Sequence, residues 1–242
     1  MKGRSLLARA VRVPLRWLPA TAVVRAPAGP LRGLRWMPAS MAHGAWLGRV
    51  EPDQLRECLR RLRPGDVLWD IGANVGLYTL PAARRVGAAG HVYAFEPIPR
   101  NLEYLQRHVE LNRVDNVTVV AAAVGDREGT VRMAPGDFPA EYHVDEAGQI
   151  VVEAIALDDW CARSGARLPQ VMKIDVEGAE DAVLRGGRET LARARPLVCL
   201  SLHGDRQREA CRAVLSGLGY DVVSLQPGRA VDVASDVLAV PR

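Results

Sequence analysis

Two apolar runs of strand length each end at an acidic residue, and together they could hold a ligand. The first run contains Asp70 and leads into a turn with Gly72 and Gly76, and the second leads into Glu96. The segment between the runs is long enough for a crossover helix, so the pattern predicts one βαβ unit. Glycine lets a turn approach a ligand closely, and the Glu96 carboxylate can accept hydrogen bonds from two ribose hydroxyls. We therefore expect a ribose-containing cofactor.

The glycine spacing distinguishes between cofactors. A dinucleotide site has the pattern G-x-G-x-x-G, whereas Asn74 occupies the second glycine position and the turn reads D-x-G-x-x-x-G. A cofactor with an ammonium and a carboxylate but no phosphate fits better, because Asp70 can face the ammonium and the turn amides the carboxylate. S-adenosylmethionine has these groups and is the predicted cofactor. The alternative is a tight turn in a sheet that binds no nucleotide.

A second group of polar residues follows two later strands. Asp175 comes at the end of an apolar strand, Glu177 opens the next predicted helix, and His203 ends the following strand. Ligands of open parallel sheets bind beyond the carboxyl ends of the strands. We therefore expect these three residues at the rim that holds the cofactor, and Glu180 as a surface charge on the predicted helix.

Three motifs together resemble the FkbM family of S-adenosylmethionine-dependent methyltransferases. They are DIGANVG at 70–76, FEP at 95–97 and KIDVEGAE at 173–180, the last followed by LRGG at 184–187. The resemblance runs from about Trp46 to Leu225, and its most specific part is DVEGAE. It implies a Rossmann-like fold and O-methylation of hydroxyls on sugars, polysaccharides, glycolipids or polyketides.

The resemblance also implies which residues form the site. The cofactor shell, whose last two members would form the adenine edge, comprises Asp70, Gly72, Ala73, Asn74, Gly76, Glu96, Pro97, Ala123 and Val124. Asp175 and Glu177 would lie on the acceptor side. One departure from the family pattern is Ser201, two residues before His203. Many relatives carry an acid at this position.

Methyl transfer from a sulfonium to a hydroxyl is an in-line displacement that a general base assists. The candidate bases are His203, whose ordinary pKa is about 6.5, and Asp175, with Glu177 as the third catalytic candidate. Metal-dependent methyltransferases of other families use clustered acids. Asp158 and Asp159 are such a pair, but they are better placed to begin a helix. Because the sequence places no third ligand beside them, we expect a site without a metal.

Alternating strands and helices predict an α/β fold with a doubly wound, Rossmann-like class I methyltransferase sheet, mostly parallel with an antiparallel edge hairpin. The predicted strands cover residues 67–71, 91–95, 117–121, 130–133, 150–155, 170–174, 197–202, 220–224 and 231–240. The predicted helices cover residues 54–62, 77–86, 99–112, 177–184 and 206–218. Pro81 should kink or fray the second helix, and His108 on the third is expected to be solvated.

Basic residues are concentrated at the N-terminus. Residues 1–50 hold nine of the 32 Lys and Arg and no acid, so residues 51–242 carry 23 basic against 28 acidic residues. We expect a basic, Pro-rich extension at 1–45 and a methyltransferase domain at 46–242. Apolar residues at helical spacing over 7–18 would allow peripheral contact with anionic lipid, although Pro14 interrupts the spacing. The alternatives are a partly disordered lead-in and packing beside the acceptor site.

The predicted location is cytoplasmic, with the inner membrane face as the alternative for the extension. The sequence lacks a secretory signal pattern and an uncharged apolar run of roughly 20 residues. Its four cysteines have no metal-binding spacing, which indicates thiols in a reducing compartment.

The predicted function is S-adenosylmethionine-dependent O-methylation of a small-molecule or glycan acceptor: a sugar, glycolipid or secondary metabolite. A polar loop at 134–149, with Glu141, Tyr142 and His143, favours a sugar. The acidic domain argues against nucleic acid. An RNA (tRNA) methyltransferase and a non-catalytic binding protein are the alternatives, and no pattern specifies the oligomeric state.

Overall fold

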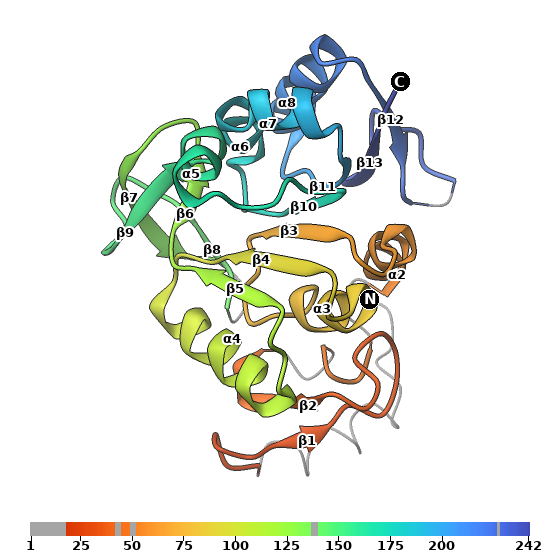
Figure 1. The fold of residues 1–242 in the computed structure, drawn as a ribbon. Helices are drawn as coiled ribbons and strands as arrows, with labels where there is room; N and C mark the ends of the chain where they lie inside the picture. Colours follow the sequence, from red (N-terminus) through yellow and green to blue (C-terminus); the bar gives the residue numbers. More distant parts are fainter. Residues whose placement is uncertain (1–17, 42–44, 49–51, 137–139, 227) are drawn as a thin grey trace.

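A seven-stranded sheet forms the centre of the protein (Figure 1). The computed structural model describes residues 18–41, 45–48, 52–136, 140–226 and 228–242. The strands of the sheet, in spatial order, are β12 (Tyr220–Ser224), β13 (Asp236–Pro241), β11 (Leu197–Ser201), β10 (Val171–Ile174), β3 (Val67–Ile71), β4 (His91–Phe95) and β5 (Val117–Val120). The strands from β11 to β5 are parallel, and β13 is antiparallel to both of its neighbours. The predicted mostly parallel sheet with an antiparallel edge is confirmed.

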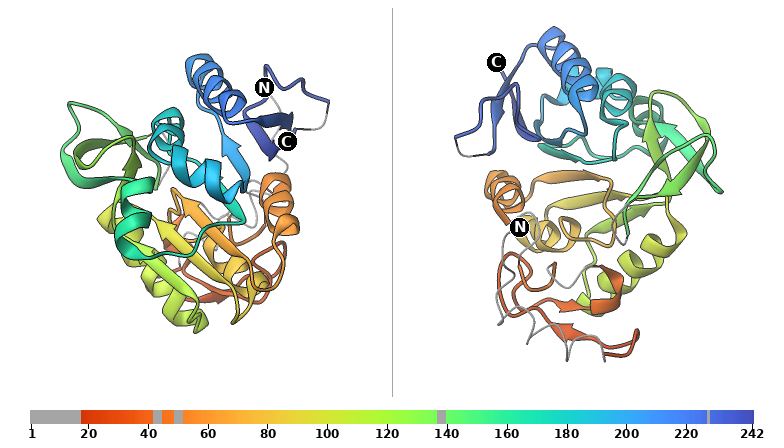
Figure 2. Two further views of the ribbon diagram at one scale, coloured as in Figure 1. Left: turned by 45° about the horizontal axis from the view of Figure 1, so that its top comes forward. Right: turned by 180° about the vertical axis from the view of Figure 1, so that it is seen from behind.

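Helices cover both faces of this sheet (Figure 2). They are α2 (Pro52–Arg61), α3 (Thr79–Val86), α4 (Pro99–Asn112), α5 (Leu157–Ser164), α6 (Glu180–Gly186), α7 (Arg188–Ala194) and α8 (Asp205–Gly217). In β3, Val67, Trp69 and Ile71 pack with α6, α7 and α8, whereas Leu68 packs with α2 and α3. Strands covered on both faces read as apolar runs, which is why β3 and β4 begin and end where the sequence predicts.

Helix α3 begins later than predicted. It starts at Thr79, so Pro81 lies in the first helical turn. Backbone N–H groups of a first turn have no partner within the helix, and a proline there costs little. The residues before Thr79 remain in the turn that follows β3.

A second, four-stranded sheet stands beside the carboxyl ends of the main strands (Figure 1). Its strands, in spatial order, are β6 (Ala123–Gly125), β9 (Ile150–Ala156), β7 (Gly129–Pro135) and β8 (Tyr142–Val144). The sequence predicts β7 and β9 but not β6 and β8, which are too short to show a period of their own. Residues 137–139 of the predicted acceptor loop lie outside the described residues.

The described part of the N-terminal extension packs against the main domain. Strands β1 (Val24–Arg25) and β2 (Arg35–Trp36) pair as a small antiparallel ladder, followed by the 3-10 turn η1 (Pro38–Ser40). Trp36 is fully buried and belongs to the core cluster of α2 and α3. The predicted lipid-binding segment, residues 7–18, lies almost wholly outside the described residues. No helix in the described ranges is long and apolar enough to cross a bilayer.

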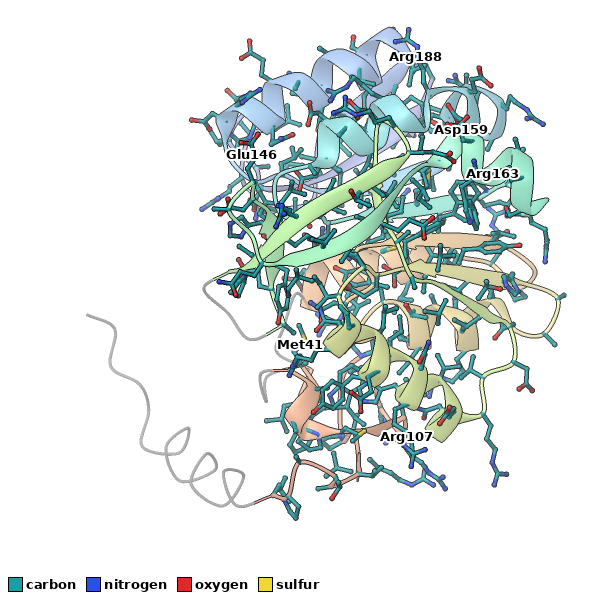
Figure 3. The ribbon with its side chains drawn as sticks, turned by 90° about the vertical axis from the view of Figure 1, so that its left-hand side faces the viewer. Met41, Arg107, Glu146, Asp159, Arg163 and Arg188 are labelled. Atoms are coloured by element: carbon teal, nitrogen blue, oxygen red, sulfur yellow. The ribbon has the colours of Figure 1, made fainter. Side chains whose placement is uncertain are left out.

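The prediction that His108 is solvated is wrong. His108 is fully buried in α4, where its ring stacks on Trp36 with centroids 4.1 Å apart. Its Nδ1 lies 2.8 Å from the Val75 carbonyl oxygen, and its Nε2 accepts a hydrogen bond of 3.0 Å from the Met37 amide. Burial lowers the pKa of His108 to about 4. A neutral imidazole therefore joins the N-terminal segment to the turn after β3, whereas its neighbour Arg107 is exposed (Figure 3).

Candidate active site

One cavity of about 500 Å³ lies at the carboxyl ends of β3, β4, β10 and β11. Its volume is in the usual range for small-molecule sites. Most of the predicted cofactor and acceptor residues line it, and they come from strand β6 and from the loops that follow β3, β4, β10 and β11. The predicted residues in its wall are Gly72, Ala73, Asn74, Glu96, Pro97, Ala123, Val124, Asp175, Glu177 and His203.

Asp70 and Gly76 are not part of the cavity wall. Asp70 is fully buried, and its Oδ2 accepts a hydrogen bond of 2.5 Å from the Thr79 hydroxyl. Its Oδ1 lies 3.6 Å from Lys173 Nζ, so Asp70 faces this ammonium inside the protein. Gly76 has a φ of +96°, and a Cβ there would come within 3.0 Å of the Leu105 side chain. Gly76 therefore serves the packing of α4 against the turn.

Gly72 allows the chain after β3 to pass close to the chain after β10. A Cβ on this residue would lie 1.9 Å from the carbonyl oxygen of Asp175. The loops after β3 and β10 thus touch through backbone atoms. The carbonyl oxygen of Gly72 itself accepts a hydrogen bond of 2.6 Å from Lys173 Nζ, which also lies 3.7 Å from Asp175 Oδ2. Lys173 is the cation between the two predicted halves of the site, and sequence reasoning assigned it no role.

Glu96 stands at the end of β4 with only 4% of its surface exposed. Its carboxylate accepts hydrogen bonds from the amides of Asn74, at 2.8 Å, and Ile98, at 2.9 Å. The Asn101 side-chain amide adds a longer bond of 3.4 Å. Burial raises the pKa of Glu96 to about 7, against the opposing effect of these donors. A carboxylate has about four acceptor positions, so capacity toward the cavity remains.

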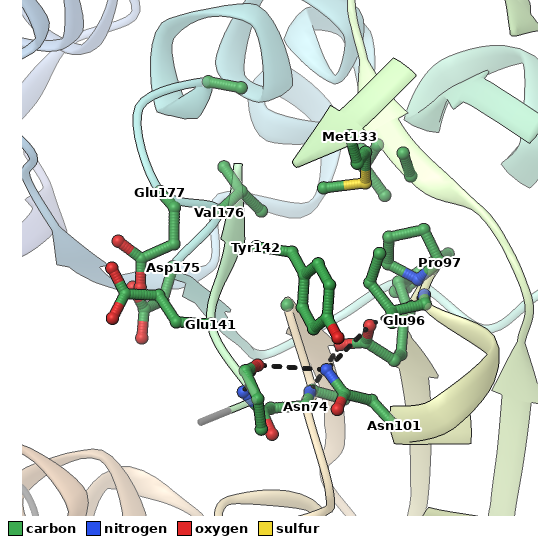
Figure 4. A pocket seen from close by; sticks show the side chains of 18 of the residues that line it. Asn74, Glu96, Pro97, Asn101, Met133, Glu141, Tyr142, Asp175, Val176 and Glu177 are labelled. Atoms are coloured by element: carbon green, nitrogen blue, oxygen red, sulfur yellow. Dashed lines mark hydrogen bonds between the residues drawn. The ribbon is translucent and has the colours of Figure 1, made fainter. Parts of the chain in front are cut away.

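Asn101 is a site residue that the sequence analysis missed. It lies in the first turn of α4 on the face that carries Leu105 and His108, and all three are buried. Its amide also donates to the Ala140 carbonyl oxygen at 3.1 Å, to which Asn74 donates at 2.7 Å (Figure 4). The sequence did contain a signal for this residue. Asn101 lies four residues before Leu105, so both are on the same face of the predicted helix, and a polar side chain on an apolar face indicates a buried hydrogen-bonding role.

Asp175, Glu177 and His203 come together on the other side of the cavity. His203 Nε2 lies 3.1 Å from Glu177 Oε2 and 3.8 Å from Asp175 Oδ1. Glu177 does not open a helix as predicted: it has a φ of +53°, and α6 begins at Glu180. This left-handed turn directs Glu177 toward Asp175 and Glu141, whereas Tyr142 points toward Glu96 (Figure 4).

Glu180 is not the surface charge that the sequence predicts. It is fully buried, and its Oε1 lies 2.7 Å from His203 Nδ1 and accepts a bond from the Gly178 amide at 3.0 Å. The hydrogen bond to Glu180, with the nearby Glu177 and Asp175 charges, raises the pKa of His203 to about 9. Burial raises the pKa of Glu177 to about 7. Both ring nitrogens of His203 therefore face carboxylates.

Ser201, the departure from the family pattern, is turned away from this cluster. Its hydroxyl accepts a hydrogen bond of 2.9 Å from the Gln54 side chain in α2, and Gln54 accepts one of 2.8 Å from the Tyr78 hydroxyl. A buried polar network on the α2 side thus replaces the acid at this position.

Comparisons with known proteins show the family to which this chain belongs. A model described as the methyltransferase FkbM domain matches residues 70–222. The chain belongs to the FkbM methyltransferase family. It therefore belongs to a family of enzymes, and the resemblance stated from its motifs is confirmed.

Three curated relatives of this FkbM-family chain are methyltransferases. The 2-O-methyltransferase NoeI of Sinorhizobium fredii is 31% identical, over 55% of this chain and 62% of the relative. The hexuronic acid methyltransferase AglP of Haloferax volcanii is 28% identical, over 57% and 56%. The 31-O-demethyl-FK506 methyltransferase FkbM of Streptomyces tacrolimicus is 29% identical, over 68% and 76%. The chain thus spans about three fifths of the length of the first two.

A solved structure supports the fold. The FkbM methyltransferase of Methylobacillus flagellatus superposes with a TM-score of 0.52 at 18% identity, covering 81% of this chain and 53% of that one. This likeness confirms the class I methyltransferase fold.

Membership in a methyltransferase family implies use of S-adenosylmethionine, and the residues present fit this cofactor. Glu96 has remaining acceptor capacity toward the cavity for ribose hydroxyls. Ala123 and Val124 offer apolar surface beyond it, where an adenine ring could pack. Asp70 faces Lys173 and not the cavity, so its predicted contact with the cofactor ammonium stays a prediction.

Proposed function

We propose that this protein transfers a methyl group from S-adenosylmethionine to a hydroxyl of a sugar, glycan, glycolipid or secondary metabolite. The observation that carries the proposal is the arrangement of the cavity. It has a buried carboxylate, Glu96, in one wall and the group Asp175, Glu177 and His203 in another. A cofactor and an acceptor can therefore meet in one cavity. Family membership and the named activities of the relatives support the same function.

The residues on the cofactor side of the cavity would hold and orient S-adenosylmethionine. Glu96 would accept hydrogen bonds from the ribose hydroxyls, and Ala123 and Val124 would contact the adenine. Asn74 and Asn101 fix the loop at Ala140 over this side through its carbonyl oxygen. S-adenosylmethionine, when bound, supplies a methyl group already activated by the sulfonium. The protein's contribution is then alignment, which is worth up to about 7–11 kcal/mol.

The acceptor side would take up a proton from the acceptor hydroxyl. Both nitrogens of His203 are engaged, by Glu180 and by Glu177. The Asp175 carboxylate lines the cavity, and among the described residues the basic groups paired with it are 3.7 and 3.8 Å away, beyond hydrogen-bond length. Asp175 is therefore our candidate base: its oxygen takes the hydroxyl proton while the acceptor oxygen bonds to the methyl carbon and the carbon–sulfur bond breaks, with the bonding pair leaving on sulfur. His203 and Glu177 would position the hydroxyl.

The cavity wall favours an acceptor rich in hydroxyl groups. Glu141 and Tyr142 join the acidic group at the cavity wall, while Phe95 and Tyr78 are the other aromatic residues among the described lining residues. Two of the relatives are named for different acceptors, one for a hexuronic acid and the other for 31-O-demethyl-FK506. A site with polar side chains selects strongly for substrates whose hydroxyl groups can bond to them. A substrate without these hydroxyls would leave the buried polar groups of the site unpaired, which is costly. A sugar or glycan is our preferred acceptor.

Label transfer tests the function. Purified protein would be incubated with methyl-labelled S-adenosylmethionine and a fractionated extract of its host cells. We expect label in glycan, lipid or small-molecule fractions, and its loss in the Asp175→Asn variant. Label only in RNA would favour the RNA methyltransferase. No label in any fraction, despite measurable cofactor binding, would favour a non-catalytic binding protein.

A further inference from the structure

We propose that Asp175, Glu177 and His203 form a binding site for a divalent cation. The sequence predicts these three residues at one rim of the sheet, and the structure brings their ligand atoms close together. One ligand atom from each residue lies within 4.8 Å of the other two. All three line the cavity described above. The site would thus present the cation to the same space that the acceptor enters.

The spacing is close to that of ligands around one octahedral ion. With metal–ligand distances of about 2.1 Å, adjacent ligand atoms are roughly 3 Å apart. The Nε2 of His203 lies 3.1 Å from Glu177 Oε2, which matches this separation, and 3.8 Å from Asp175 Oδ1. The Asp175 oxygen would therefore move by less than about 1 Å when the ion binds. Two carboxylates with one imidazole suit a first-row divalent cation such as Mn²⁺. The remaining coordination positions would face the cavity.

Glu180 provides an independent observation. Histidine ligands usually donate their second ring N–H to a carboxylate, which fixes the ring and leaves the other nitrogen free for the metal. Glu180 Oε1 occupies this position, 2.7 Å from His203 Nδ1. Its other oxygen, Oε2, is buried and has no hydrogen-bond partner among the described residues. A buried carboxylate without full hydrogen bonding is stabilised by nearby positive charge.

The balance of charge points the same way. Among the described residues, four carboxylates lie against the side chains of Lys173 and His203, namely Asp70, Asp175, Glu177 and Glu180. Lys173 lies between Asp70 and Asp175, so the acidic group retains an excess of negative charge. A cation between Asp175 and Glu177 would offset their mutual repulsion.

The role of the ion rests on the proposed function. A hydroxyl bound to a divalent cation has a lowered pKa, so it would give up its proton more readily to the carboxylate oxygen of Asp175 that does not bind the metal. The cation would also orient neighbouring oxygens of a sugar. Binding of the ion itself requires no acceptor and can be measured alone.

The first experiment is titration of the full chain with Mn²⁺, followed by electron paramagnetic resonance. We expect saturable binding of one ion per chain and, in pulsed spectra, coupling to one imidazole nitrogen. No saturable binding up to about 1 mM, a limit equivalent to roughly −4 kcal/mol, would overturn the proposal. This measurement uses the unmodified protein, so it does not depend on how any variant folds.

Variants locate the ion. Glu177→Gln and His203→Gln should each weaken Mn²⁺ binding at least about tenfold, the usual minimum for loss of even an outer-shell partner. His203→Gln should also abolish the nitrogen coupling. The matched control is Glu146→Gln, which removes the same charge from an exposed position in the turn after β8 (Figure 3). Equal binding by all three variants would place the ion elsewhere.

The outcomes separate this proposal from the proposed function. Mn²⁺ binding without label transfer would leave the cation site standing and contradict the methyltransferase activity. Label transfer with no Mn²⁺ binding would support the methyltransferase activity and contradict the cation site.

Discussion

Glu96 is a carboxylate kept from water by the fold and held by two backbone amides. Its position follows from β4, which ends one residue earlier, and from Ile98, the N-cap residue of α4, whose amide donates to it. Hydrogen bonds to an ionised group contribute about 1.5–3 kcal/mol each. Most of the affinity for the ribose should therefore depend on this one charge.

Replacing Glu96 with Gln should raise the dissociation constant for S-adenosylmethionine at least about tenfold at pH 8, because a neutral amide accepts weaker hydrogen bonds. Isothermal titration calorimetry would measure the effect. Glu103→Gln, an exposed change on α4, serves as the control and should bind as the unmodified protein does. Equal affinities in all three proteins would show that Glu96 does not hold the cofactor.

Asp175 can be tested separately from cofactor binding. Asp175→Asn should lower the turnover of methyl transfer by roughly 10²–10⁴-fold, the usual contribution of a general base, with S-adenosylmethionine affinity within about threefold of the unmodified protein. Single-turnover kinetics with labelled cofactor would measure it. Asp159→Asn, on the exposed side of α5 (Figure 3), should retain full turnover. Full turnover in Asp175→Asn would remove Asp175 from the mechanism.

Among the elements, β2 and α4 show how the N-terminal segment supports the site. Trp36 stacks on His108, and His108 contacts the carbonyl of Val75 in the turn after β3. The chain thus links its first described strands to the cofactor turn through one buried imidazole. The sequence boundary proposed at residue 45 separates segments that share a core.

Trp36→Ala should lower the free energy of unfolding by about 3–5 kcal/mol, as for other fully buried aromatic residues. Chemical denaturation would measure the loss. Val23→Ala removes side-chain volume from the same segment at a position 45% exposed, and it should change stability by less than about 0.5 kcal/mol. A small effect of Trp36→Ala would mean that the segment is not part of the core.

For the whole molecule, two buried groups oppose each other in the pH dependence of stability. Burial raises the pKa of Glu96 from 4.5 to about 7, so its contribution to stability falls as pH rises through this interval. Burial lowers the pKa of His108 from 6.5 to about 4, so its contribution falls as pH drops through that interval. Each contribution is about 3 kcal/mol, and between pH 4.5 and 6.5 they nearly cancel.

Single variants should reveal the two contributions. Without cofactor, Glu96→Gln should become more stable as pH rises from 4.5 to 6.5, because the effect of His108 remains. His108→Gln should become less stable over the same range, because the effect of Glu96 remains. Urea denaturation at several pH values would measure both, and parallel profiles in the two variants would contradict the assignment.

Local patterns predict much of the fold. The strands β3 and β4 and the helix α4 have the predicted bounds. The signals for them, apolar runs for the two strands and a proline at the start of the helix, each lie within a short stretch of sequence. Glu96 was found for the same reason. The short strands β6 and β8 escaped because their pairing partners, not their own residues, make them strands.

The sequence by itself determined the α/β class, the turn after β3 and the carboxylate at the end of β4, because each depends on neighbouring residues. Only the tertiary structure decided that Glu180 is buried behind His203, that Glu177 turns toward Asp175, and that His108 is enclosed by Trp36. These contacts join residues far apart in the chain or depend on a left-handed backbone turn. Strand order and helix packing create them, and no local period encodes either.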